Sequence, residues 1–223
     1  MGRVATMSKV ALALGLVCLL VGCSHGASPS MTADISRVTE LKSSFGPDFK
    51  VSEIPPRAID PQFFAARKLP DGLTFDPAIC ATAAVGPPLP PGLQGNMAAV
   101  TAEGNGNRFV VIAVETSQTL PTNDPGKECA KIAFSGAGVR GGIEVVEAPH
   151  IEGVHTLGVH RVLQALVDGS AHTGELYDFS AQFGDYQLNV IANPLVVPGQ
   201  NVAPVDTHRA RDLLVKAVQA VRH

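Results

Sequence analysis

The clearest pattern in the chain is a pair of alternating segments that flank a two-residue turn at Gly184-Asp185. With that turn, Phe183 faces Tyr186, and the further pairs on the same face are also apolar or aromatic, whereas the other face pairs polar residues. A shift of one residue would move the apolar set to the wrong face. The pattern therefore predicts a β-hairpin over 175–193 with one buried face and one solvent-exposed face.

The last stretch of the chain has a different period, with apolar side chains three and four residues apart. Asp206 stands just before it and is a typical residue to cap the start of a helix. The pattern predicts a C-terminal amphipathic helix that packs on the apolar face of the sheet. The apolar stripe consists of Ala210, Leu213, Leu214, Ala217, Val218 and Val221.

Three further helices are predicted nearer the N-terminus. Residues 32–45 carry apolar side chains at helical spacing and end at a Gly-Pro pair. Two Asp-Pro dipeptides resemble helix starts, with aspartate as N-cap and proline in the first turn. They predict short helices over 78–85, capped by Asp76, and over 124–134. The proline-rich residues 46–75 are expected to be irregular.

Strands are expected on both sides of a glycine- and asparagine-rich turn, over 96–102 and 108–116. Residues 143–148 and 154–167 are predicted as two more strands, although 160–166 are also compatible with a helix. Together with the hairpin, these segments predict an α+β fold. We expect a single antiparallel sheet of five or six strands with helices packed mainly on one face.

The N-terminal pattern is not that of a folded domain. Arg3 and Lys9 are followed by 12 uncharged, largely apolar residues, 10–21, whereas a membrane-spanning helix needs about 20. We therefore expect residues 1–22 to be a signal peptide.

The apolar run ends in the sequence Leu-Val-Gly-Cys at 20–23, which resembles the lipobox of bacterial lipoproteins. The resemblance implies that Cys23 is diacylated and becomes the first residue of the mature protein. Residues 23–31 would then tether a single domain, 32–223, to the membrane, and two acyl chains anchor a protein stably. The alternative is an ordinary signal peptide with an incidental cysteine.

Composition narrows the possible partners. Removing residues 1–22 leaves 201 of 223 residues and takes away two of 17 basic residues, so 15 basic residues face 20 acidic ones and the net charge is −5. We therefore do not expect the protein to bind nucleic acid. An acidic surface does not attract anionic lipid headgroups either. We expect the acyl chains on Cys23 to make the membrane contact.

Two cysteines remain in the predicted domain once Cys18 leaves with the signal peptide and Cys23 is lipidated. A cysteine pair in an exported protein favours a disulfide between Cys80 and Cys129. The bond would close a loop of about 50 residues and stabilise the fold by roughly 4 kcal/mol in the chain-entropy model. The alternative is two buried free thiols.

Several short matches to catalytic patterns lack the context that the chemistry needs. Residues 136–141 match G-x-G-x-x-G, but no strand precedes and no helix follows as a dinucleotide site requires. Ser170 and His172 are neighbours in a turn, and Glu144 and Glu147 would point to opposite faces of a strand. We expect no catalytic residues and no cofactor.

Histidines are the remaining candidates for a metal site. No pair has the spacing of a helical zinc site, and residues five apart on a strand point to opposite faces. We therefore expect surface or half-buried histidines and no metal. The four considered are His150, His155, His160 and His172.

Four aromatic residues gather on the apolar face of the predicted hairpin. The simplest interpretation is core packing beneath the C-terminal helix. The alternative is that helix and sheet part to form a hydrophobic pocket for a lipid-like ligand. The four residues are Tyr177, Phe179, Phe183 and Tyr186.

The lipobox, the small-residue stretch around Cys80 and the hairpin turn at 183–186 before a C-terminal helix resemble mycobacterial lipoproteins of unknown function. More loosely, residues 70–222 are similar to the extracellular sensor domain of the mycobacterial kinase PknH. The resemblance implies an α+β domain with a groove and a binding role of unknown ligand. It supplies no catalytic residues.

These patterns lead to a ranked expectation for function. The first is a non-enzymatic binding or sensor-like module on the outer face of the cytoplasmic membrane, whose ligand and oligomeric state stay open. The second is a carrier of a lipid or glycolipid, and the third is a hydrolase. A large apolar cavity would favour the carrier, and a solid core with a polar groove the sensor. A buried Ser-His-acid cluster would favour the enzyme.

Overall fold

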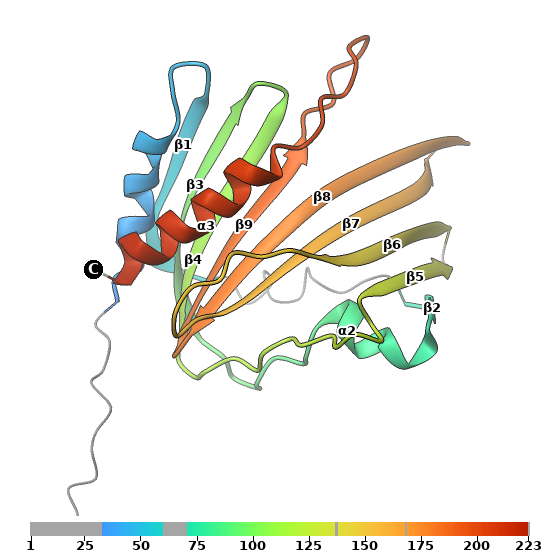
Figure 1. The fold of residues 1–223 in the computed structure, drawn as a ribbon, viewed down its shortest axis with the longest axis horizontal. Helices are drawn as coiled ribbons and strands as arrows, with labels where there is room; N and C mark the ends of the chain where they lie inside the picture. The colour runs from blue at the N-terminus through green and yellow to red at the C-terminus, as the bar shows by residue number, and fades with distance from the viewer. Residues whose placement is uncertain (1–32, 60–70, 137, 168, 223) are drawn as a thin grey trace, which may run out of the picture. The chain divides into compact units, whose positions relative to one another are not determined.

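The computed structural model describes most of the chain after the predicted tether (Figure 1). The predicted signal peptide and the predicted lipidation site Cys23 lie outside the described residues. Within the described part of the chain, no helix is both long and apolar enough to cross a membrane. The described residues are 33–59, 71–136, 138–167 and 169–222.

One antiparallel sheet of nine strands organises the fold, in the order β1-β3-β4-β9-β8-β7-β6-β5-β2. The predicted α+β class is confirmed, but the prediction of five or six strands is wrong. The strands are β1 (Lys50–Ala58), β2 (Thr74–Asp76), β3 (Gly95–Gly104), β4 (Asn107–Thr116), β5 (Lys131–Gly136), β6 (Val139–Val146), β7 (His155–Val167), β8 (Ser170–Phe183) and β9 (Tyr186–Pro194).

The hairpin of β8 and β9 has the predicted register. Phe183 pairs with Tyr186, and the apolar pairs continue along one face, while Gln182 pairs with Gln187 on the other. The alternation fixes this register, because a slip would expose the apolar set. The remaining apolar pairs are Ala181 with Leu188, Phe179 with Val190 and Tyr177 with Ala192.

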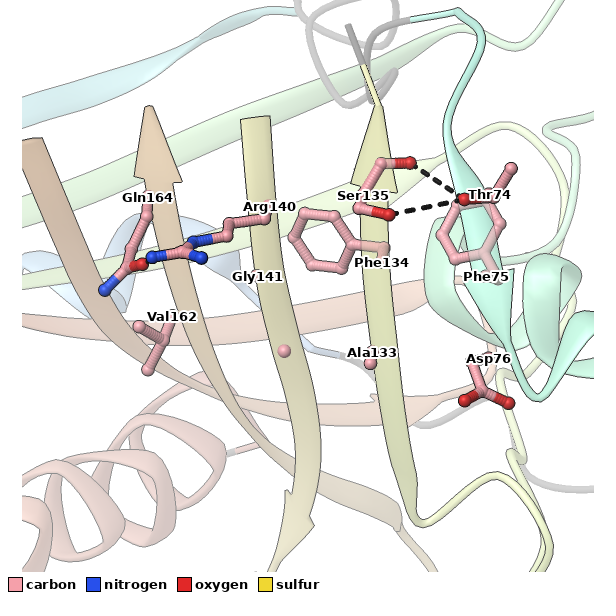
Figure 2. A pocket seen from close by; sticks show the side chains of 11 residues that line it. Thr74, Phe75, Asp76, Ala133, Phe134, Ser135, Arg140, Gly141, Val162 and Gln164 are labelled. Carbon is pink, nitrogen blue, oxygen red and sulfur yellow. Dashed lines mark hydrogen bonds between the residues drawn. The ribbon is translucent and has the colours of Figure 1, made fainter. Parts of the chain in front are cut away.

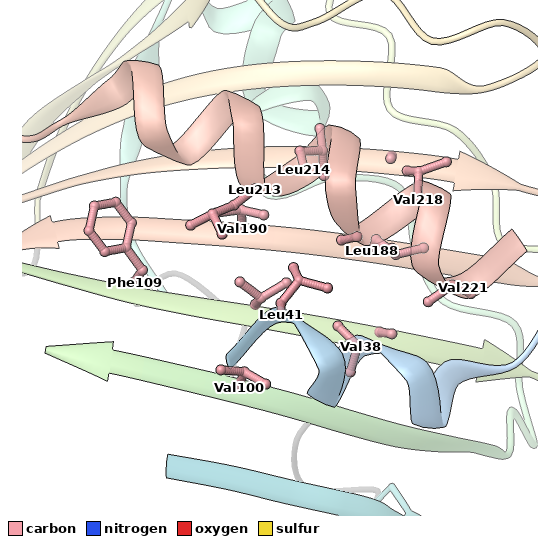
Figure 3. Close-up of a cluster of buried hydrophobic side chains, with 14 of the residues drawn as sticks. Val38, Leu41, Val100, Phe109, Leu188, Val190, Leu213, Leu214, Val218 and Val221 are labelled. Atoms are coloured by element: carbon pink, nitrogen blue, oxygen red, sulfur yellow. The ribbon is translucent and has the colours of Figure 1, made fainter. Parts of the chain in front are cut away.

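Two helices cover one half of one sheet face, which we call the helical face (Figure 3). They are α3 (Thr207–Arg222) and the 3-10 helix η1 (Ile35–Ser44). All six residues of the predicted α3 stripe are buried, and Asp206 caps the helix by accepting a hydrogen bond from the Arg209 N–H at 2.9 Å. The two helices pack mainly over β3, β4 and β9, with β8 at their margin.

A smaller apolar cluster lies on the opposite, or disulfide, face. The 3-10 helix η2 (Ala78–Cys80) and α2 (Ala81–Val85) pack there against Ile132, Phe134 and Ile143. The expectation that helices pack mainly on one face therefore holds for the two longer helices but not for α2. The cause is the strand parity of β5 and β6, which directs these apolar side chains away from α3.

The N-terminal half corrects two predictions. Residues 46–75 are not irregular throughout, because they contain β1 and part of β2. β1 is an edge strand whose register shifts between Ile54 and Arg57, where two prolines stand, and edge strands tolerate proline. Asp76 does not cap a helix, since it ends β2 and pairs with Ala133.

The predicted helix over 124–134 is also wrong. Residues 126–129 form turns, and β5 begins at Lys131. The alternation of Ile132 and Phe134 with polar or small residues matches the pleat of a strand and buries both side chains. The structure joins Cys80 to Cys129 with a Cα–Cα distance of 5.5 Å, so the bond connects a short helix to a turn rather than two helices.

Candidate functional site

The other half of the helical face, over β5, β6 and β7, is the candidate site. Segment 147–154 borders it, because Ile151 and Val154 pack against the core beneath α3 and Arg222 donates to two carbonyl oxygens of the segment. Beyond this border the side chains of β5 are exposed on this face. The antiparallel register arranges the residues of this half of the face in three rows that run across the strands.

The first row is polar (Figure 2). Arg140 Nε donates to Gln164 Oε1 at 2.8 Å across the β6–β7 pair. Thr74 Oγ1 donates to the Ser135 carbonyl oxygen at 3.0 Å on the neighbouring strands. The bond to Gln164 uses only one of the Arg140 donors, so the guanidinium keeps donors for another group.

The second row is made of small or apolar side chains. Ala133, Gly142 and Val162 are in register on β5, β6 and β7. The row ends in a carboxylate on either side, with Asp76 on β2 and Glu175 on β8. The short side chains leave the sheet surface low between the first and third rows.

The third row is charged and aromatic. Lys131 Nζ lies 2.8 Å from Glu144 Oε1, and His160 is paired with Glu144 in the register of the sheet. His160 Nε2 lies 2.9 Å from Glu175 Oε1 of the second row, and its ring stacks on Tyr177 with centroids 4.2 Å apart. The row therefore presents donors and acceptors beside an aromatic platform.

The three rows form a depression that we call the trough. The first and third rows are its rims, and the second row between them is its floor. A hollow of about 530 Å³ occupies its first two rows. Figure 2 shows Arg140, Gln164, Ser135 and Thr74 at one side of this hollow and Ala133 and Asp76 farther along it. The hollow is open to solvent, so a ligand could reach it without a change in the fold.

Three groups in the third row have shifted pKa values. The hydrogen bond and charge of Lys131 lower the pKa of Glu144, and Glu144 raises the pKa of Lys131 in the same way. Burial raises the pKa of Tyr177, and the charges of Glu175 and Glu144 add to that shift. At neutral pH the row therefore carries a charged Lys–Glu pair and a neutral tyrosine hydroxyl.

The four hairpin aromatics predicted as possible ligand contacts have different environments in the structure. Phe179 and Phe183 are 1% and 5% exposed and belong to the core beneath α3. Tyr186 is half-buried, and its hydroxyl lies 3.2 Å from the Ala33 carbonyl oxygen and 3.1 Å from Glu115. Only Tyr177 of these four adjoins the trough.

The structure also places the other candidates. His155 and His160 point to opposite faces of β7, as predicted from their spacing. Residues 136–141, which match the dinucleotide pattern, lie in the β5–β6 hairpin and not between a strand and a helix. Ser170 and His172 are exposed near the tip of β8. Within the ranges that the structure describes, no three His, Cys, Asp or Glu side chains gather as a metal site would require.

Sequence reasoning missed most of the trough. Arg140, Gln164 and Lys131 were not considered, because β5 was predicted as a helix and the register of β5, β6 and β7 was unknown. One local signal was present: polar or small residues alternate with Ile132 and Phe134 along β5. That period of two would have indicated a strand with one polar face.

The fold and site define an α+β domain with one large antiparallel sheet and a polar depression on its uncovered half. The chain belongs to the family described as a domain of unknown function, DUF5642, which matches residues 34–222. No protein with curated annotation matches the chain.

Two solved structures are similar to the chain. The first is an uncharacterized protein of Mycobacterium smegmatis, the Rv0999 ortholog, with 55% identity, a TM-score of 0.80, and coverage of 86% of this chain and 98% of that one. It confirms the predicted kinship with mycobacterial proteins of unknown function. The second is the extracellular domain of PknH from Mycobacterium tuberculosis, with 12% identity, a TM-score of 0.37, and coverage of 85% and 93%.

Proposed function

We propose that this chain is a membrane-anchored, extracytoplasmic binding or sensor-like module that recognises its ligand through the trough. The observation that carries the proposal is the row of paired but solvent-accessible polar groups beside a low strip of the sheet. A fully structural surface has no need for a hollow of this size lined by Arg140, Gln164 and Asp76.

The location rests on two independent features. The disulfide between Cys80 and Cys129 is typical of oxidising compartments outside the cytoplasm. The predicted lipidation of Cys23 would hold the module at the outer face of the cytoplasmic membrane. Together they favour a module that meets its ligand in the cell envelope.

The packing favours a binding module over the alternative of a lipid carrier. A carrier needs an apolar cavity, whereas Phe179 and Phe183 fill the space between sheet and α3, and the hollow in the trough is open and partly polar. A hydrolase is less well supported, since Ser170 and His172 are both exposed and lie two residues apart on one strand.

Hydroxyl-radical footprinting of the purified protein tests the proposal, with a detergent extract of actinobacterial cell envelope as the probe. We expect the extract to reduce labelling of His160 and Tyr177. His155 is the matched control, because it is exposed on the same strand but on the opposite face. Unchanged labelling of His160, or an equal loss at His155, would count against the trough as the binding site.

A further inference from the structure

We propose that the trough binds a neutral oligosaccharide whose rings lie across β5, β6 and β7. This inference rests on the proposed function, because it names the ligand class of the same site. It is carried by the chemistry of the three rows and by a glycine that the packing of the domain does not explain.

Gly142 has no structural reason to be glycine. A Cβ at that position would meet only the Ile132 carbonyl oxygen, at 3.8 Å. Its neighbour Gly141 is different, since a Cβ there would come within 2.2 Å of the Val162 carbonyl oxygen and collide with the Phe134 ring. Glycine inside a strand weakens it, and where packing does not require it, it often marks the close approach of a ligand.

The rims of the trough suit hydroxyl groups. A sugar hydroxyl both donates and accepts hydrogen bonds, and the trough offers both partners. Arg140 and Lys131 supply donors, whereas Glu144 and Asp76 supply acceptors. All four residues belong to the three rows that form the trough. The apolar floor can contact the C–H face of a ring, as the walls of small-molecule sites do.

The charge balance favours a neutral ligand. The trough contains the cations Arg140 and Lys131 against three carboxylates, Asp76, Glu144 and Glu175. An anionic polymer would meet this excess of carboxylates, and a cationic ligand would meet Arg140, whose hydrogen-bonded partner is the neutral Gln164. A polyhydroxyl compound avoids both costs, because it needs hydrogen bonds and no counter-charge.

The dimensions fit several rings. The second row crosses five strands from β2 to β8, and neighbouring strands are about 4.8 Å apart, so the row is roughly 19 Å long. The first and third rows are four residues apart along each strand, or roughly 13 Å between their Cα positions. Long side chains from both rows can therefore reach the edges of a ring on the floor.

A printed array of neutral and uronic-acid-containing bacterial oligosaccharides tests the ligand class, followed by calorimetric titration with the best soluble binder. We expect the wild-type protein to retain neutral oligosaccharides. Gly142→Val should lower the affinity by about tenfold or more, because its side chain occupies the floor. Its thermal unfolding temperature should not fall, since a Cβ at this position meets only the Ile132 carbonyl oxygen at 3.8 Å and valine favours a strand.

Gly174→Val is the matched control, because a Cβ at this strand glycine meets nothing within 4 Å and points to the opposite face. It should leave the affinity unchanged. Ala133→Leu fills the same floor from β5 and replaces Gly142→Val if that variant does not fold. Arg140→Ala should weaken binding by about tenfold through the loss of charge-assisted hydrogen bonds.

Three results would overturn the inference: no saccharide retained, a preference for acidic saccharides, or equal affinities of Gly142→Val and Gly174→Val. The footprinting experiment separates this failure from that of the proposed function. If the envelope extract protects His160 while the array stays empty, the trough remains a binding site and only the saccharide class is rejected. If neither experiment gives a signal, both proposals fail.

Discussion

Tyr177 and Tyr186 show how one hairpin face gives its residues different roles. Tyr177 stacks on His160 where the core meets the trough, whereas Tyr186 fastens the start of the described chain through its bond to the Ala33 carbonyl oxygen. Burial is the main cause of the raised pKa of each, and Glu115 contributes further for Tyr186 through a hydrogen bond and its charge. Both hydroxyls are therefore held in the neutral form by the fold.

The raised pKa values predict a loss of stability in alkali. An unfolded tyrosine ionises near pH 10, whereas the folded ones ionise at higher pH, so the unfolded state loses protons first. The stabilisation from these groups is complete below pH 10 and declines as the pH rises through the folded pKa values. We expect denaturant unfolding at a series of pH values to show a flatter alkaline decline in the Tyr177→Phe/Tyr186→Phe variant.

Lysines titrate in the same pH range as tyrosines. Comparing the double variant with the wild type isolates the contribution of the two tyrosines to the pH dependence of the unfolding free energy. Tyr186→Phe also loses a hydrogen bond, which lowers the unfolding free energy by about 1 kcal/mol at neutral pH. This loss does not change how steeply the unfolding free energy falls with pH in alkali. A double variant with the alkaline decline of the wild type would contradict the assigned shifts.

At the scale of elements, two of the three apolar clusters among the described residues stabilise different parts of the sheet. The larger cluster joins α3 and η1 to the central strands, and the smaller one lies around the disulfide with Phe134 and Ile143. β2 contributes three residues to the sheet and is followed directly by η2 with Cys80. Its position at the end of the trough therefore depends on the disulfide region rather than on α3.

Removing the disulfide should loosen this region first. The bond closes a loop of 49 residues, for which chain entropy gives about 4 kcal/mol of stabilisation. In Cys80→Ala/Cys129→Ala we expect a lower unfolding free energy and faster amide exchange in β2 and β5. Exchange in β4 and β9 should change least, because their shared core is separate. Equal acceleration throughout the sheet would contradict this division into two clusters.

The sequence predicted those strands and helices in which apolar residues recur with one clear period over many positions. The β8–β9 register and the α3 stripe are of this kind, since a slip or rotation would expose many apolar groups. The period of two in β5 covers only six residues, and the aspartate and proline before it suggested a helix start. The prolines in β1 likewise concealed a strand that is possible because it lies at an edge.

At the scale of the whole molecule, the site could not be predicted from the sequence because it depends on pairing between distant segments. Asp76 and Ala133 are 57 positions apart, yet they share a row through the β2–β5 pairing. The place of Gly142 in the floor of the trough follows only from its pairing with residues on β5 and β7. Sequence patterns identify which residues of a strand share a face, but the order of strands decides which faces meet.

The predicted anchor at Cys23 would determine where the whole molecule acts. The described chain begins beside the end of α3, where the Asp34 N–H donates to the Val221 carbonyl oxygen at 2.8 Å. If Cys23 is diacylated, the tether of nine residues reaches at most about 30 Å. The domain, and the trough with it, would then stay close to the membrane surface, within reach of envelope components.

Metabolic labelling with an alkynyl palmitate analogue in an actinobacterial host tests this anchor. We expect the wild-type protein to take up the label and to sediment with membranes, because two acyl chains hold a protein stably. Cys23→Ala should lose both properties while its unfolding temperature stays the same, since the substitution precedes the predicted domain 32–223. A wild-type protein that is exported without label would mean that 1–22 is an ordinary signal peptide, and the trough would then act on freely diffusing ligands.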